Sequence, residues 1–90
     1  HHDQTQRQYE TTVDGHLARL TYERDGERVV MTHTLVPPAI GGRGVAAALV
    51  EVAVRDAAEA DLTVVPACSY VAAWLRRTPA RAATVKVASR

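Results

Sequence analysis

The stretch Gly41-Gly42-Arg43-Gly44-Val45-Ala46 decides how this chain can fold, because a glycine-rich turn runs directly into an apolar-periodic segment. Val45, Ala48 and Leu49 begin a stripe at helical spacing, which predicts a helix over residues 44–60. The first turn of a helix presents backbone N–H groups without internal partners, and the helix dipole adds partial positive charge there. Glycines in front let the main chain approach a ligand closely. The stretch therefore predicts an anion cradle suited to a phosphate or pyrophosphate.

Composition indicates one small domain. The chain has 90 residues, a formal net charge of +1 and 47% hydrophobic residues, among which alanine and valine dominate and phenylalanine is absent. Small side chains allow close helix-on-sheet packing, although each buries little apolar area. A nucleic-acid-binding domain would normally carry a clear basic excess, so the near-neutral charge argues against that class.

The start of the chain is expected to lie outside the domain. His1-His2 and the polar run up to residue 7 are typical of a purification-tag remnant and predict a disordered tail, which leaves residues 8–90 as the domain. These histidines are excluded as metal ligands, and no metal site is expected. The single cysteine, Cys68, cannot form an internal disulfide, and no secretory or membrane-spanning segment is evident. A cytoplasmic protein without membrane association is the expectation.

The first third of the chain predicts an antiparallel meander. Asp14-Gly15 and Asp25-Gly26 each separate stretches of alternating polarity, which favours tight hairpins joining strands at 8–13, 16–24 and 28–36. In the third strand, the two faces read Val29, Met31, His33, Leu35 and Val30, Thr32, Thr34, Val36. Because both faces are fairly apolar, this strand is expected at the centre of the sheet and covered on both sides.

The second half predicts a helical crossover. Pro37-Pro38 ends the third strand, since neither residue can donate a backbone hydrogen bond. After the helix, residues 62–65 predict a short strand that should lie parallel to the third one. A second helix is expected at 69–77, closed by Thr78-Pro79. The predicted fold class is therefore α+β, with a three-stranded meander, a helix, a parallel fourth strand and a short second helix.

Three motifs in this order resemble the GNAT superfamily of N-acetyltransferases, in particular its reduced single-domain branch. The family signature Gln/Arg-x-x-Gly-x-Gly/Ala falls on residues 41–46, with Gly41 in the place of the long polar residue. His33-Thr34-Leu35-Val36-Pro37 precedes the turn, and Pro66-Ala67-Cys68-Ser69-Tyr70 follows the next strand. The match runs from about Tyr9 to Pro79, and three ordered motifs are far more specific than one glycine loop.

The resemblance implies binding of acetyl-coenzyme A. In such folds the third and fourth strands splay apart and the pantetheine arm lies between them. The pyrophosphate would bind the backbone N–H groups of residues 42–46. The cofactor site at the turn and the helix start would comprise Gly41, Gly42, Arg43, Gly44, Val45, Ala46 and Ala47. Backbone N–H groups near Leu35 and Val36 would contact the thioester oxygen. Arg76, Arg77 and Arg81 are candidates for the outer phosphate, and the alternative for these three is a solvated basic face.

Cys68 is the first candidate catalytic residue. It lies between a strand end and a helix start, where the helix dipole lowers the pKa of a thiol and favours the thiolate. The resemblance implies that Cys68 lies near the thioester of the cofactor. In that position it could accept the acetyl group covalently or protonate the departing coenzyme A thiolate. The alternative is a small buried hydrophobic residue.

Tyr70 and His33 are the other catalytic candidates. Through the resemblance, Tyr70 would be the proton donor to the leaving sulfur, and its alternative is packing beside Trp74, four residues on. His33 could act as a general base for an incoming amine, since its unperturbed pKa suits neutral pH. Its alternative is a core histidine beside Val29 and Met31.

The residues and the resemblance leave three alternative functions for this chain. The first is a small N-acetyltransferase that moves acetyl from acetyl-CoA to an unidentified amine on a small molecule or protein. The second is a non-catalytic coenzyme A-binding module. The third, a KH-type RNA-binding loop at residues 41–44, fits poorly because a strand and Pro37-Pro38 lead into it and Ala47 stands where a bulky apolar residue is needed. A P-loop is excluded, since no Lys-Ser/Thr pair follows the glycines. A monomer or weak homodimer is expected, with the first strand as an open edge.

Overall fold

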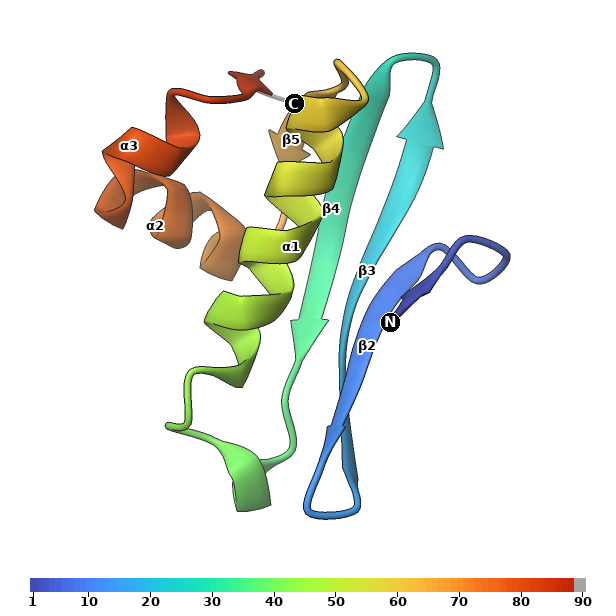
Figure 1. Ribbon diagram of the computed structural model, residues 1–90, viewed down its shortest axis with the longest axis vertical. Helices are drawn as coiled ribbons and strands as arrows, with labels where there is room; N and C mark the ends of the chain where they lie inside the picture. Colours follow the sequence, from blue (N-terminus) through green and yellow to red (C-terminus); the bar gives the residue numbers. More distant parts are fainter. Residues whose placement is uncertain (89–90) are drawn as a thin grey trace.

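A computed structural model of the chain describes residues 1–88. Six strands form one sheet in chain order: β1 (His2–Asp3), β2 (Gln8–Val13), β3 (His16–Asp25), β4 (Arg28–Leu35), β5 (Thr63–Pro66) and β6 (Lys86–Val87). The helices are η1 (Pro38–Ile40, a 3-10 turn), α1 (Val45–Glu59), α2 (Ser69–Arg77) and α3 (Pro79–Ala82). Strands β1 to β4 pair antiparallel, whereas β5 and β6 each run parallel to the preceding strand (Figure 1). The predicted α+β class, the meander and the parallel fourth strand are confirmed.

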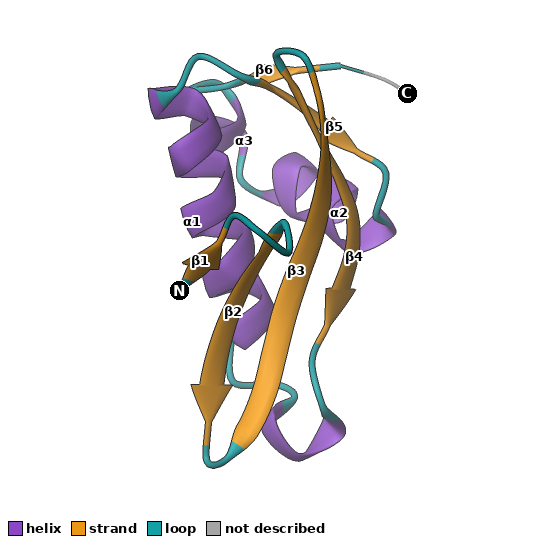
Figure 2. Ribbon diagram, turned by 90° about the vertical axis from the view of Figure 1, so that its right-hand side faces the viewer, coloured by secondary structure: helices purple, strands orange, loops and turns teal. Residues whose placement is uncertain are grey.

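The core lies between the sheet and two helices. Helices α1 and α2 both cover the same face of the sheet, and Figure 2 looks onto the opposite face. The largest fully buried side chains that pack in this core include Leu20, Met31, Ile40, Val50, Val64 and Val71. The expectation that both faces of β4 are covered is wrong, because no helix within residues 1–88 lies over the second face of the meander (Figure 2). Burial on one side is enough to hold an antiparallel meander, whose other face can meet water.

A β-bulge changes which residues of β4 face the core. Tyr22 lies opposite Met31, but Thr21 lies opposite His33, so Thr32 is an extra residue in β4. The Thr32 Oγ1 is 3.0 Å from the Oγ1 of Thr21 and donates to its carbonyl oxygen at 3.3 Å. An extra residue reverses the alternation of side chains beyond it. Thr34, which lies opposite the buried Leu20, is therefore on the core side.

The predicted packing of His33 and Leu35 with Val29 and Met31 is wrong for this reason. Val29 and Met31 are buried, whereas His33 is exposed and Leu35 keeps 54% of its surface accessible. Strict alternation along residues 28–36 placed all four on one face, and a single inserted residue breaks it.

The ends of the chain add elements that the sequence did not predict. Within the first seven residues, which were expected to form a tail, His2–Asp3 forms β1 and pairs with Tyr9 and Gln8 of β2. After residue 80, α3 completes a turn and β6 pairs with β5. Strands of two residues carry too little periodicity to be read from sequence alone.

We expect Leu20→Ala to lower the free energy of unfolding by about 3 kcal/mol, because it leaves a cavity at a fully buried position. Leu17→Ala on the same strand is the matched control: 40% of the Leu17 surface is accessible, and we expect a change within about 0.5 kcal/mol. Urea denaturation measures both. Equal losses would contradict the assignment of the two faces of β3.

Candidate functional site

The glycine turn between η1 and α1 is open to solvent. Residues 41–44 are all exposed. Gly42 and Gly44 have φ angles of +78° and +74°, which L side chains rarely adopt, and a Cβ built on either would have no atom within 4 Å. Gly44 caps α1 without any side-chain hydrogen bond, and the first bond of the helix runs from Ala48 N–H to the Gly44 carbonyl at 3.0 Å. The amides of Val45, Ala46 and Ala47 therefore have no partner in the helix, which is the arrangement that the predicted anion cradle requires.

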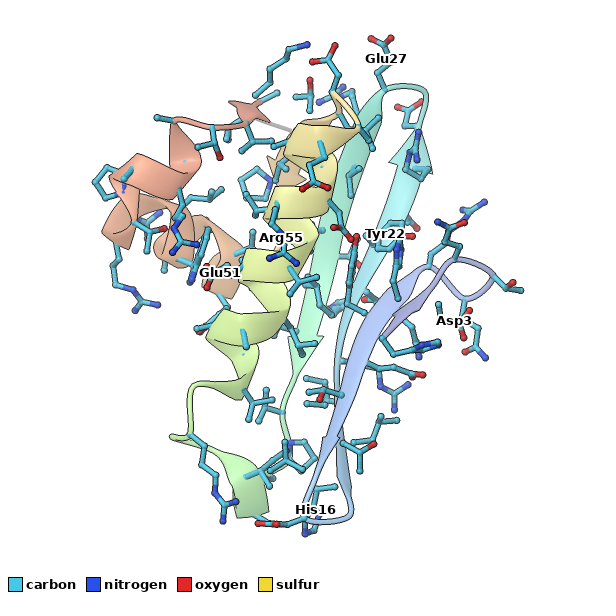
Figure 3. The ribbon with its side chains drawn as sticks, in the orientation of Figure 1. Asp3, His16, Tyr22, Glu27, Glu51 and Arg55 are labelled. Carbon is cyan, nitrogen blue, oxygen red and sulfur yellow. The ribbon has the colours of Figure 1, made fainter. Side chains whose placement is uncertain are left out.

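Arg43 is held at the edge of this cradle by Asp14. Its guanidinium Nη1 lies 2.5 Å from the Asp14 carboxylate in the turn between β2 and β3. That turn, marked by His16 in Figure 3, lies beside the loop that leads into α1. Both side chains are more than half exposed, so the pair contributes little to stability. An incoming phosphate would compete with Asp14 for the guanidinium.

Strand β4 has a free edge next to the cradle. Its parallel pairing with β5 ends at Met31 and Pro66, and the next contact is the Cys68 N–H donating to the Met31 carbonyl at 2.9 Å. Beyond Met31, this edge of β4 has no strand partner within residues 1–88. An extended ligand could add to such an edge through main-chain hydrogen bonds. Leu35 is exposed at its end, and Val36 packs partly against the core.

Cys68 is the N-cap of α2 and lies against the core side of β4. Its side chain is partly buried, and its Sγ is 3.6 Å from the Oγ1 of Thr34. Burial alone would raise the pKa of the thiol, but the backbone amide of Val71, the Thr34 side chain and the amide of Tyr70 lower it, and the pKa is below its ordinary value. Hydrogen bonds to the anionic form favour that form, so the site stabilises a thiolate.

Only two of the three catalytic candidates lie on one side of the sheet. Tyr70 is in the first turn of α2, next to Cys68, and is half-buried against the core, with the Arg77 guanidinium 5.8 Å from the centre of its ring. His33 lies opposite Thr21 and is exposed on the other face of β4. Thr34 takes the place beside the thiol. Sequence reasoning missed it, because only the bulge brings it to this side.

The basic residues of α2 and α3 show no contact with the cradle within residues 1–88. Arg81 pairs with Glu51, which projects from the middle of α1 (Figure 3), and Arg77 lies over Tyr70. Arg76 is exposed. These contacts favour the alternative of a solvated basic face over a phosphate site.

Residues 1–88 lack both a membrane-spanning helix and a cluster of metal ligands. No helix in this range is long and apolar enough to cross a membrane. Nor do three or more His, Cys, Asp or Glu side chains of these residues gather in a group that could hold a metal ion.

Comparison with known proteins identifies the family of this chain. Residues 8–85 match the sequence model described as GCN5-related N-acetyl-transferase. The chain belongs to this GNAT family. It is similar to the proteins named NATD1 of Mus musculus and Gallus gallus, each 36% identical over 81 residues that cover 87% of this chain and 74% of the relative. The Homo sapiens NATD1 is 36% identical over 81 residues, which cover 87% of this chain and 72% of that protein. Membership of the GNAT family supports a general acetyltransferase function.

We expect Thr34→Val to raise the pKa of Cys68, because it removes a hydroxyl that lowers this pKa while keeping the side-chain shape. The rate of alkylation by iodoacetamide, followed against pH, measures the change: the midpoint moves to higher pH and the rate at neutral pH falls. Thr34→Ser, which restores a hydroxyl, should return the midpoint toward that of the parent. An unchanged profile in Thr34→Val would contradict the assigned contact.

Proposed function

We propose that this chain is an acetyl-CoA-dependent N-acetyltransferase that acts on an amine. The observation that carries the proposal is the combination of an open amide cradle at the start of α1, a free edge of β4 and a thiol of lowered pKa beside that edge. A cradle alone would suit any phosphate, and a thiol alone would be structural. Their arrangement around one strand end suits a ligand with a diphosphate, an extended arm and a thioester.

The residues of the cradle fit the diphosphate of acetyl-CoA. Gly42 and Gly44 lack a Cβ at positions where one would face open space, so the backbone can contact a bulky anion directly. The amides from Gly42 to Ala47 would hold the diphosphate, and Arg43 would add a charge-assisted contact on release from Asp14. When bound, acetyl-CoA supplies an activated acetyl group as a thioester.

The edge of β4 and the start of α2 would carry the chemistry. Backbone N–H groups near Leu35 and Val36 would stabilise negative charge on the thioester oxygen. Cys68 would accept the acetyl group on Sγ. Its lowered pKa favours the thiolate, which can attack the thioester but has no proton to give to the leaving sulfur. Tyr70, in the first turn of α2, would supply that proton through its hydroxyl. The amine would then attack the acetyl-Cys68 thioester, which forms the amide, releases the Cys68 thiolate and returns the amine proton to Tyr70.

The second candidate function is a coenzyme A-binding module without catalysis. It is favoured by the position of His33, the proposed base for the amine, which points away from Cys68 on the other face of β4. Without a base, a protonated amine would not be activated at this site, although a cofactor could still bind.

Calorimetric titration with coenzyme A tests cofactor binding, and Gly44→Ala should weaken it about tenfold. An alanine at the φ of +74° is strained by roughly 1–2 kcal/mol. The backbone would change conformation to relieve this strain, and the amides of the cradle would then no longer be aligned for the anion. Gly26→Ala is the matched control, since Gly26 has a φ of +60° in the turn between β3 and β4, far from the cradle. Equal affinity in both variants, or no binding by the parent, would refute the cradle.

Intact-mass analysis after incubation with acetyl-CoA tests the catalytic role. We expect one acetyl group on the parent, mapped to Cys68, and none at this position in Cys68→Ala, which should still bind coenzyme A because the cradle is intact. Addition of a panel of small amines should discharge the acetyl group from the parent. Tight binding without acetyl transfer to the protein or to any amine would support the binding module instead.

A further inference from the structure

A cavity of about 360 Å³ lies on the side of α1 that faces the N-terminal hairpin. Its walls include Tyr9 of β2, Tyr22 of β3, Ala53, Asp56 and Glu59 of α1, and His2 of β1. Tyr22 lies between the C-terminal half of α1 and the N-terminal loop (Figure 3). Asp56 is twelve residues beyond Gly44, about 18 Å along the helix axis, so this cavity is separate from the amide cradle.

The chain places one of its own nitrogen heterocycles at the wall of this cavity. The His2 ring stacks on the Tyr9 ring, with 4.0 Å between centroids and an interplanar angle of 8°. Its Nε2 is 2.5 Å from the Tyr22 hydroxyl, and the Tyr22 ring is tilted beside it at 5.6 Å. His2 belongs to the two-residue strand β1 at the edge of the sheet, which also pairs with β2, and His1 beside it exchanges two backbone hydrogen bonds with Glu10, at 2.8 and 2.9 Å. The two tyrosines thus form a stacking platform and a polar contact that suit a planar nitrogen ring.

Two carboxylates, Asp56 and Glu59, stand against one arginine, Arg24, on the wall of this cavity. The Tyr9 hydroxyl donates to Asp56 Oδ2 at 3.0 Å, which fixes the carboxylate at the wall. Burial, followed by Asp56, raises the pKa of Tyr9, so its hydroxyl keeps the proton that it donates. Glu59 is exposed on the same wall and has no ion-pair partner within residues 1–88. Arg24 is the one arginine among the wall residues and donates to the Gly26 carbonyl at 3.0 Å. Burial raises the pKa of Tyr22, whereas the positive charges of Arg24 and Arg7 lower it, so some positive charge also lies near the Tyr22 hydroxyl.

We propose that this cavity is a second ligand site, for a small planar nitrogen heterocycle that carries an ammonium group, and that His2 is its intramolecular occupant. The ligand ring takes the place of the His2 imidazole on Tyr9 and bonds the Tyr22 hydroxyl. The ammonium lies against Asp56 and Glu59, where aromatic faces and carboxylates both favour a cation. The proposal does not depend on the acetyltransferase reaction, since no residue of the cavity belongs to the cradle or to the thiol site.

Histamine is the probe, because it joins an imidazole ring to an ammonium group. Titrations followed by backbone amide chemical shifts should show changes at Tyr9, Tyr22 and Ala57. In His2→Ala, which vacates the site, histamine should bind at least about tenfold more tightly than in the parent, since no internal ring has to be displaced. His1→Ala is the matched control: the His1 side chain is 70% exposed, and the variant should bind like the parent. Equal affinity in the parent and in His2→Ala would overturn the proposal.

Two further measurements test what the site recognises. In the His2→Ala background, Asp56→Asn keeps an acceptor for the Tyr9 hydroxyl but removes the charge, and should weaken histamine about tenfold. 4-Methylimidazole lacks the ammonium group, so it should bind His2→Ala and the double variant His2→Ala/Asp56→Asn weakly and with equal affinity. If Asp56→Asn leaves histamine affinity unchanged, the cavity is not a cation site. Coenzyme A affinity should stay the same in all these variants, so a failure here is distinct from a failure of the proposed acetyltransferase function.

Discussion

Strand β4 pairs along its length with β3 but along only part of its length with β5, and the site depends on this mismatch. The pairing with β5 stops at Met31 because the chain turns away after Pro66 into α2. The bulge at Thr32 falls at this same level of the strand. It increases the local twist and moves the side chains beyond it to the opposite faces. One irregularity therefore frees an edge of backbone and at the same time directs Thr34 toward Cys68.

The start of each long helix lies at one end of this free segment of β4. Helix α1 presents amides capped by a glycine, and helix α2 is capped by the cysteine itself. Unpaired N–H groups stabilise negative charge in both places, on a phosphate in one proposal and on a thiolate in the other. Gly44 has no side chain that could satisfy the amides of α1, whereas the Val71 and Tyr70 amides of α2 act on the Cys68 thiol and lower its pKa. Small residues such as Ala46 and Ala47 keep the first turn of α1 thin enough for a bulky anion.

Helix α1 also separates two regions with different chemistry. Its buried stripe, including Leu49, Val50 and Ala53, anchors it on the sheet. Its N-terminus faces the free edge of β4, whereas Asp56 and Glu59 near its C-terminus line the aromatic cavity against β2 and β3. Because about 18 Å of packed helix lies between them, the two regions can be altered independently. A ligand at the second could influence the first only through a displacement of the helix.

Local patterns in the sequence determined most of the architecture: two Asp-Gly turns defined the meander, apolar spacing defined α1 and α2, and residues 41–44 indicated an anion cradle. These features depend on neighbours in the chain, so periodicity and turn chemistry reveal them. Only the tertiary structure decided that His33 lies on the face of β4 away from Cys68, that Thr34 lies beside Cys68 and that His2 stacks on Tyr9. Each of these depends on how separate strands align, and a bulge or a two-residue strand carries no periodic signal by which a single sequence could reveal it.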